Sequence, residues 1–408
     1  MRLKGWGHGV QAGMTEVGYA ADDVGCGVVD FALEPFPGVT SLAALWRELE
    51  RRSDCSFFLS WKWIGTWLEL TKIQPVVFVG RHAGQVVCLG LLASLSRTRH
   101  GVLRSHGLYL NETGDPEQDI IAIEHNGFVV DARFGPTVIG DALEYLLQLD
   151  DRHPLLGNWD ELRLGGVPAY YEKIADQRGL RRHTINRRGT AVVDLDAIRA
   201  GGGDYLASLS ANTRYQIRRS MRLYEARAPL NLAWAQSAQE AHTFLDGLKQ
   251  LHQPYWEARK GKGAFSYPFL VDFHARLVDQ CTVNQDYELA RVRCGDQDIG
   301  YIYNLIRGRW VGFYLGGFRF EEDNKMKPGM VCFAMCLEHH LGRKTSAFDF
   351  LAGDQRYKTN LATPQPGLVW FDLQKSRMKL RLEDLARDAR SIMRRTASIE
   401  SGSGKAGK

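Results

Sequence analysis

The chain has 408 residues, of which 44% are hydrophobic and 24% charged, and its formal net charge is +5 at pH 7. This length suits two domains, and the composition is that of a soluble globular protein. No window is apolar for long enough to span a membrane, and the modest positive charge does not by itself indicate nucleic acid.

The first part of the chain predicts a loosely ordered Gly-rich lead-in over residues 1–27 and a first domain over 28–196. The lead-in lacks the apolar stretch of a secretory signal, and the seven cysteines form no C-x-x-C pair. We therefore expect a cytoplasmic protein. The expected elements are helices at 41–52 and 60–70, strands at 75–81 and 85–97, extended segments at 101–110 and 128–133, a helix at 137–149, a strand at 160–166, a helix at 169–179 and a strand at 189–196.

The second part predicts a domain over 197–374, an amphipathic helix over 375–396 and a flexible tail over 397–408. The expected elements are helices at 206–227, 238–253 and 268–280, strands at 287–294, 298–307 and 310–320, a helix at 329–341, a strand at 346–353, a short helix at 354–362 and a strand near 368–373. Both parts thus read helices, strands, helix, strand, helix, strand. We expect a duplicated α/β fold of the mixed α+β kind, in which each unit has a mixed sheet flanked by helices.

The start of the helix at 329–341 is a candidate anion site. Pro328 suits the first helical turn, Gly329 allows close approach of a ligand, and Lys325 and Lys327 lie beside free helix N–H groups. A plain Pro-Gly turn before a core helix explains the same residues equally well.

The strand at 310–320 is interrupted by Gly312, Gly316 and Gly317. Such glycines mark a bulge or a close approach, and a bulge exposes a backbone N–H that can polarise a carbonyl oxygen. Close packing of a neighbouring helix is an equally common cause.

Other polar and aromatic residues are weaker candidates. Arg214, Arg218 and Arg222 share one helical face, which favours an anionic partner or simply a solvated surface. Trp256, expected in a linker between helices, is a candidate for lining an acceptor pocket. Cys332 and Cys336, one helical turn apart in an apolar run, are typical of buried free thiols, and no zinc spacing is present.

Residues 205–360 resemble the GNAT acyltransferases of the CelD-like branch, a relative of the Fem peptidyltransferases. The resemblance rests on LSANTRYQIRRSMRLYEA (209–226), YWEARKGKG (255–263), GRWVGFYLGGF (308–318), the Lys-Pro-Gly before the helix, and FDFLAGDQRYK (348–358). Paired GNAT-like units in Fem-like proteins fit the duplicated order of elements. The first half resembles the branch only through FFLSWKWIGTW (57–67).

The resemblance implies N-acyl transfer by direct attack of an amine on a thioester. The donor pyrophosphate would lie at Lys327, Pro328, Gly329 and Met330, and the donor carbonyl along Tyr314, Gly316 and Gly317. No permanently bound cofactor and no metal are implied. The chain departs from the Gly-rich loop of better-known GNAT enzymes, which leaves an acyl carrier protein or aminoacyl-tRNA open as the donor in place of acyl-CoA.

The corner at 348–358 carries the candidate catalytic residues. Strand alternation places Asp349 on the face opposite Phe348 and Phe350, where a partly buried carboxylate can act as general base. Asp354 is a second acidic candidate, the resemblance gives Tyr357 as the acid for the leaving thiolate, and Lys358 would bind donor phosphate or carboxylate. Alternatively, Asp349 or Asp354 caps the following helix and Lys358 is solvated.

The leading hypothesis is a cytoplasmic, bacterial-type N-acyltransferase with two GNAT-like domains, of which the C-terminal one is catalytic. It would use acyl-CoA or an acyl carrier protein and act on a small-molecule amine or amino sugar. It expects neither DNA nor a transmembrane segment. One alternative is Fem-like transfer from aminoacyl-tRNA, with the arginines of 181–188 and 214–222 on RNA phosphates. Another is a non-catalytic GNAT-like scaffold in polysaccharide or lipid biosynthesis.

Overall fold

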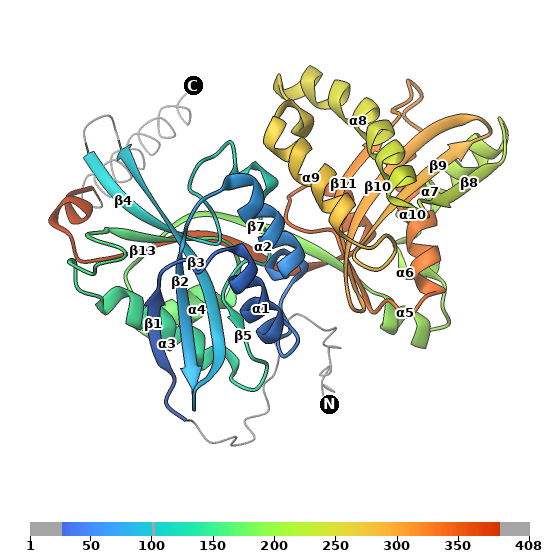
Figure 1. The fold of residues 1–408 in the computed structure, drawn as a ribbon. Helices are drawn as coiled ribbons and strands as arrows, with labels where there is room; N and C mark the ends of the chain where they lie inside the picture. Colours follow the sequence, from blue (N-terminus) through green and yellow to red (C-terminus); the bar gives the residue numbers. More distant parts are fainter. Residues whose placement is uncertain (1–26, 100–102, 384–408) are drawn as a thin grey trace, which may run out of the picture.

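The computed structural model describes residues 27–99 and 103–383. Its described strands form one 13-stranded mixed sheet with helices on both faces. Figure 1 shows two halves side by side, with β7 and β13 passing from one half toward the other. Among the described residues, no helix is both long enough and apolar enough to cross a bilayer.

The first unit comprises the elements up to β7. In chain order these are β1 (Asp30–Glu34), α1 (Val39–Glu50), α2 (Trp61–Thr71), β2 (Val76–His82), β3 (Gln85–Arg99), β4 (Leu103–Leu110), β5 (Val129–Val130), α3 (Gly135–Gln148), β6 (Glu161–Pro168), α4 (Tyr170–Gln177) and β7 (Arg182–Asp194). Short 3-10 turns lie at η1 (Phe57–Leu59) and η2 (Asp119–Ile121).

The second unit begins after the short connecting helices α5 (Leu195–Ala200) and α6 (Tyr205–Ser208). Its elements are α7 (Ala211–Glu225), β8 (Leu230–Trp234), α8 (Ala238–Lys260), η3 (Ala264–Ser266), α9 (Pro268–Gln280), β9 (Tyr287–Cys294), β10 (Gln297–Arg307), β11 (Trp310–Phe318), α10 (Pro328–Leu341), β12 (Ala347–Asp349), α11 (Arg356–Leu361) and β13 (Thr363–Gln374).

The predicted repetition of element order is confirmed. From β1 and from β8, each unit runs through a strand, two helices, an antiparallel three-stranded meander, a helix, a strand, a helix and a last strand. In each unit the third meander strand pairs parallel with the strand after the helix: β4 with β6, and β11 with β12.

The two units exchange their last strands. The sheet order is β1-β2-β3-β4-β6-β13-β7-β12-β11-β10-β9-β8. Strand β6 of the first unit therefore pairs with the last strand of the second unit, and β12 pairs with the last strand of the first. Strands β7 and β13 also pair with each other over most of their length, so each long strand belongs to both units.

The hydrophobic core differs between the two faces of the sheet. On one face, residues of α1, α2, α8 and α9 share a single core that joins the units. On the other face, α10 covers one core in the second unit, and α3 with α4 covers a separate core in the first. The shared core explains the aromatic residues of η1 and α2, which are buried there.

Several predicted boundaries are wrong for identifiable reasons. The helix expected at 206–227 is interrupted, because Ser210 is the N-cap of α7 and accepts a hydrogen bond from the Thr213 amide at 3.2 Å. Helix α8 continues past Pro254 to Lys260, so Trp256 lies within a helix and not in a linker. Strand β7 already begins at Arg182, which places most of the basic 181–188 segment in the sheet.

The sequence analysis missed β1, β8 and α5. The predicted helix at 375–396 is helical from 378 to 383, and its remainder lies outside the described residues, as do residues 1–26 of the lead-in and the tail at 397–408.

Candidate functional site

The candidate site lies where β11 and β12 part. The two strands pair only from Trp310 to Gly312, opposite residues 347–349. Beyond that point β11 stays with β10, while the chain after Asp349 stays beside β7, since the Phe350 amide donates to the Ala191 carbonyl at 2.9 Å. We call this opening, beyond Gly312 and Asp349, the second fork, because it lies in the second unit. The equivalent position in the first unit, where β4 pairs with β6, is called the first fork.

Strand β11 carries a bulge at the second fork. Tyr303 of β10 lies opposite Leu315 and Asn304 lies opposite Phe313, so Tyr314 between them has no partner in the register. The predicted bulge in this strand is confirmed, although it falls on Tyr314 and not on a glycine. A bulge redirects the backbone of the strand, and here it does so on the edge that β12 has left.

Gly317 is explained by close packing of a neighbouring helix, the alternative that the sequence left open. A Cβ atom at this position would lie 2.4 Å from the Leu248 carbonyl oxygen, so the glycine allows α8 to pack closely on β11. At Gly316, the carbonyl oxygen lies 3.0 Å from Nδ1 of His252. Tyr314 donates its hydroxyl to the Ile121 carbonyl at 2.7 Å and thereby joins the two units.

Asp349 is held in a fixed orientation at the mouth of the second fork. Its Oδ1 accepts a hydrogen bond from the Leu351 amide at 2.8 Å, and Leu351 has a left-handed φ of 58°. Its Oδ2 lies 3.1 Å from Nε2 of His125, which comes from the other unit. The Asp349 side chain is 3% exposed and that of His125 is 18% exposed, so the imidazole is the group that solvent and ligands reach.

Glu124 and His125 are site residues that the sequence analysis missed. They lie in the loop between η2 and β5, and Glu124 accepts a hydrogen bond from the Ala352 amide at 2.6 Å. Burial raises the pKa of Glu124 to about 7 despite that hydrogen bond. Burial alone would lower the pKa of His125, but the hydrogen bond and charge of Asp349, with the charge of Glu124, raise it.

A buried asparagine holds this loop in place. Asn126 donates from Nδ2 to the carbonyls of Leu110 on β4 and Gly165 on β6, at 2.9 and 3.0 Å. The Asn111 side chain donates in turn to Asn126 Oδ1 at 2.9 Å. The loop is therefore anchored in the first unit while its tip reaches Asp349 in the second.

Lys358 is buried, so the expectation of a solvated lysine is wrong. Its Nζ donates to the carbonyls of Leu351 and Ala352 at 3.1 and 2.8 Å, and the residue is 5% exposed. Burial lowers its pKa against the opposing charges of Glu124 and Asp349. The ammonium group stabilises the corner at Asp349 and has little freedom to reach a donor phosphate.

Asp354 is exposed, outside the hydrogen-bonded group at Asp349. The prediction that Asp349 or Asp354 caps the following helix is wrong, because α11 begins at Arg356 with Gln355 as its N-cap and no capping side chain. Tyr357 stacks on Phe333 of α10 at 5.6 Å between ring centroids, and burial raises the pKa of its hydroxyl.

Asp349 and Tyr357 lie on different faces of the sheet. Phe348 and Phe350 are in the α10-side core with Tyr357 packed against it, whereas Ala347 is in the shared core. The predicted alternation along this strand is confirmed. If Asp349 and Tyr357 act on the same substrate, the substrate has to pass through the second fork, since the two side chains lie on opposite faces of the sheet.

The start of α10 has the geometry expected of an anion site. Pro328 is the first helical residue, and the amide of the N-cap residue Lys327 donates to Ser220 Oγ at 2.8 Å. A Cβ atom at Gly329 would meet only Phe318, at 3.5 Å, so the protein itself does not crowd this position. The amides of Gly329 and Met330 lie in the first turn, where helix N–H groups have no partner within the helix.

The other predicted binding residues are not among the groups that hydrogen-bond or pair with Asp349 in the described part of the chain. Arg214 donates from Nη1 to the Ala207 carbonyl at 3.1 Å and satisfies the end of α6, which is a structural role. Arg218 is exposed on α7. Trp256 lies on α8 with its ring centroid 4.7 Å from Lys260 Nζ and 6.0 Å from the His252 ring.

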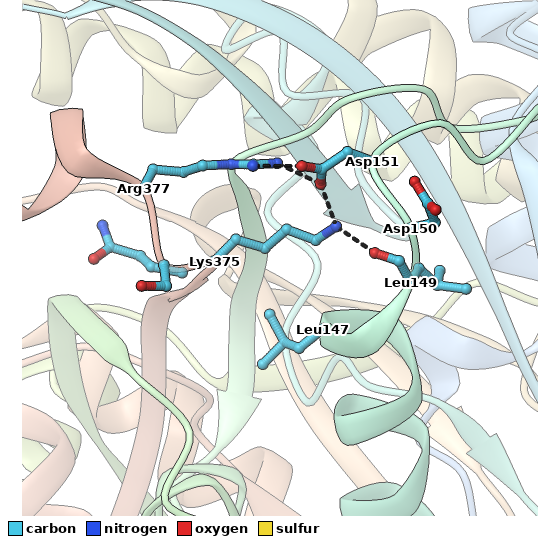
Figure 2. Close-up of a pocket in the computed structure, with 8 residues that line it drawn as sticks. Leu147, Leu149, Asp150, Asp151, Lys375 and Arg377 are labelled. Atoms are coloured by element: carbon cyan, nitrogen blue, oxygen red, sulfur yellow. Dashed lines mark hydrogen bonds and ion pairs between the residues drawn. The ribbon is translucent and has the colours of Figure 1, made fainter.

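A surface depression in the first unit is a separate feature. It is lined by the end of α3 and the segment after β13, and Figure 2 shows Lys375 and Arg377 meeting Asp151 across it. Lys375 Nζ lies 3.0 Å from Asp151 Oδ1, and the hydrogen bonds from Arg377 and Lys375 lower the pKa of Asp151. Its ion pairs fasten the chain after β13 to α3, and no predicted site residue lines it.

Part of the second unit matches a known protein family. Residues 211–359 match the family model of the acetyltransferase (GNAT) domain. Those residues are a GNAT-superfamily domain, and they contain β11, the start of α10 and the Asp349 corner. A search of the curated proteins finds no match.

Solved structures share the fold over most of the chain. FemX superimposes with a TM-score of 0.53 at 13% identity, covering 85% of this chain and 98% of that one. The C-terminal domain of a putative lysylphosphatidylglycerol synthetase from Agrobacterium fabrum gives 0.49 at 12%, covering 83% and 93%. L-PGS from Bacillus licheniformis gives 0.47 at 12%, covering 89% and 99%. The FemX superposition shows that the chain has the fold of FemX.

Proposed function

We propose that the protein is an N-acyltransferase that moves an acyl group from a thioester to an amine at the second fork. The observation that carries this proposal is the His125–Asp349 pair at the mouth of the fork, beside the bulge at Tyr314. A histidine oriented by a buried carboxylate is suited to general base catalysis, because the carboxylate raises its pKa and fixes which ring nitrogen is free.

In the proposed reaction, His125 takes a proton from the acceptor ammonium through Nδ1, since Nε2 faces Asp349. The amine nitrogen then bonds to the thioester carbon, the carbon–sulfur bond breaks, and the nitrogen releases its second proton to solvent as the amide forms. Backbone N–H groups at the Tyr314 bulge would stabilise the negative charge on the carbonyl oxygen. The leaving thiolate takes a proton from Tyr357, whose raised pKa keeps its hydroxyl protonated.

The donor would place its phosphate groups at the start of α10. Lys327, Pro328, Gly329 and Met330 supply a helix N-terminus with room beside Gly329. Acyl-CoA and an acyl carrier protein both present a thioester on a phosphopantetheine arm, so both fit this chemistry. The acceptor would be a small-molecule amine or amino sugar that approaches His125.

The test is release of free thiol from a panel of acyl-CoAs and acyl carrier proteins in the presence of amines. Wild-type protein should release thiol with at least one pair, and His125→Gln should reduce kcat by about 10²–10⁴-fold, the usual share of a general base. His242→Gln is the matched control, since His242 is a partly exposed histidine 2.7 Å from an aspartate, Asp279. No turnover and no donor binding across the panel would overturn the proposal.

Transfer from aminoacyl-tRNA is the second candidate, favoured by the exposed Arg218 and Arg222 on α7. The other basic segment is less suited, because Arg182 and Arg187 both pair with Glu172 at 2.8 Å. This candidate expects tRNA binding that weakens steeply with salt and is reduced by Arg218→Ala with Arg222→Ala. Binding that is absent or insensitive to salt would remove it.

A further inference from the structure

A second buried group of polar side chains lies in the second unit, away from the fork. It consists of Glu288 on β9, Asn304 on β10, and Cys336 and His340 in the last turns of α10. Glu288, Asn304 and Cys336 are 0% exposed and His340 is 1% exposed. Charged and polar groups this deeply buried require partners, so their arrangement calls for an explanation.

The side chains converge although three separate elements supply them. One donor atom each from Glu288, Cys336 and His340 lies within 4.8 Å of the other two. His340 Nε2 is 2.7 Å from Glu288 Oε1, and Asn304 Nδ2 is 3.7 Å from Cys336 Sγ. Three such atoms at this spacing surround a volume of about the size that one metal ion with its bonds requires.

The protein groups satisfy one another only in part. Asn304 Nδ2 donates to Glu288 Oε1 at 2.8 Å, and His340 Nε2 lies at ion-pair distance from the same oxygen. Glu288 Oε2 and Asn304 Oδ1 are buried and have no hydrogen-bond partner among the described residues. Arg343 Nη1 is 3.7 Å from Glu288 Oε2, beyond hydrogen-bonding distance. A buried polar group without a partner is destabilising, so an ion pair between histidine and glutamate alone is an incomplete account of this group.

The ligand types indicate which ion fits. A thiolate, an imidazole and a carboxylate form the kind of mixed sulfur, nitrogen and oxygen set that Zn²⁺ accepts. The two negative charges of Cys336 and Glu288 would balance the ion inside an apolar core. We propose that Glu288, Cys336 and His340 bind one Zn²⁺, with Asn304 Oδ1 as the fourth ligand once its amide group turns over and exchanges its hydrogen bond to Glu288 Oε1 for a bond to the metal.

Binding requires small, specific changes. Ligand atoms about 2.0–2.3 Å from Zn²⁺ stand roughly 3.3–3.8 Å apart, so His340 and Glu288 have to separate slightly. Cys336 releases its thiol proton and His340 binds through the neutral Nε2, which makes the affinity fall at low pH. Thr345 Oγ1, 3.3 Å from His340 Nδ1, is placed to fix the ring as an outer partner.

With four protein ligands and no open position, the zinc site is structural. It would fasten the last turns of α10 to β9 and β10, while the first turn of the same helix faces the donor.

The experiment measures zinc in the tag-free, full-length protein, as purified and after reconstitution under reducing conditions. We expect one zinc ion per chain, and loss of that zinc in Cys336→Ser. Cys332→Ser is the matched control, because Cys332 is also 0% exposed and lies one turn earlier on α10. Replacing zinc with Co²⁺ should give a thiolate charge-transfer band that Cys336→Ser lacks.

Wild-type protein without zinc after reconstitution would overturn the proposal, and so would equal zinc in wild type and Cys336→Ser. If Cys336→Ser does not fold, the wild-type cobalt spectrum decides, and the absence of a thiolate band would then overturn the proposal.

Discussion

Each unit has a fork between two parallel strands, but the two forks carry different side chains at the equivalent position. Residues 107–109 of β4 pair with 161–163 of β6 as residues 310–312 pair with 347–349, so Arg163 occupies the position of Asp349. Arg163 is neutralised within the protein, with Nε 2.5 Å from Asp372 Oδ1. Asp349 instead faces a partly exposed histidine. We therefore expect the side chains of the first fork to stabilise the fold and those of the second fork to take part in the proposed reaction.

The first fork is regularly paired and bridged by a side chain, whereas the second fork is bulged. Strand β4 pairs with β3 without a register shift, whereas β11 is bulged at Tyr314. The Asn126 side chain bridges the first fork by donating to Leu110 on β4 and Gly165 on β6. The same loop carries His125 to the second fork, so the first unit contributes a candidate catalytic group while its own fork is closed.

The largest expected effect separates Asp349 at the second fork from Asp372, the partner of Arg163 at the first fork. Asp349→Asn should lower kcat by about 10²–10⁴-fold, because the His125 base loses its carboxylate partner. Asp372→Asn should leave kcat per folded molecule nearly unchanged but reduce the free energy of unfolding by about 3–5 kcal/mol, since Arg163 is left unpaired. Thiol-release kinetics and urea denaturation measure the two effects. Similar kinetics for both variants would remove the distinction between the forks.

Asn126→Ala should weaken the bridge across the first fork. Two buried carbonyls lose their donor, which we expect to reduce the free energy of unfolding by about 3 kcal/mol. Asn360→Ala, at an exposed position of α11, is the control and should change it by less than about 0.5 kcal/mol. Urea denaturation of both variants checks this, and equal midpoints would contradict a bridging role for Asn126.

Two glycines near the second fork should respond differently to alanine. Gly317→Ala should cost about 1–3 kcal/mol of stability, because its Cβ would meet the Leu248 carbonyl at 2.4 Å. Gly329→Ala should fold normally, since its nearest contact is 3.5 Å, but should raise KM for the donor. Thermal melts with steady-state kinetics distinguish the two. An unchanged KM in Gly329→Ala would place the donor elsewhere.

A smaller effect concerns two partly buried glutamates, both in the first unit. Burial raises the pKa of Glu124 from 4.5 to about 7 and that of Glu112 from 4.5 to about 8. Because the folded state favours the protonated form, stability should fall as the pH rises from 4.5, and it should level off above each folded pKa. Each glutamate should contribute on the order of 2 kcal/mol to this fall, allowing for partial exposure.

Denaturation from pH 4 to 9 tests this relation. Glu124→Gln should remove the part of the slope below about pH 7, and Glu112→Gln should also flatten the curve up to about pH 8. The raised pKa of His125 adds a slope of the same sign, since its stabilisation is lost as the pH rises through that pKa. A wild-type curve that rises over this range would contradict the assignment.

Much of the fold could be predicted from sequence because its elements have strong local signals. The bounds of α9 and β9 are as predicted, since Pro268 begins a clear helical period and residues 287–294 lie between turns. Strand exchange had no such signal, because the pairing of β6 with β13 depends on the whole sheet.

Only part of the candidate site could be predicted from the sequence, because the rest depends on contacts between residues far apart in the chain. Asp349 stood out because it lies at a strand-to-helix corner of a recognisable motif. His125 is 224 residues away from it in the chain, in a loop whose sequence is typical of any polar turn. The sequence predicts that Lys358 binds a donor phosphate or carboxylate, or alternatively is solvated. Only the tertiary packing reveals the two carbonyls that hold it.

Exchange of the last strands also bears on how the chain is made. Strand β13, at residues 363–374, fills the sheet position beside β6 in the first unit. During synthesis, β6 and β7 leave the ribosome well before the strand that lies between them. The first unit would then expose unpaired strand edges, which favour aggregation, until nearly the whole chain has been translated. Fragments split between the units should accordingly be insoluble alone and recover the fold when co-expressed.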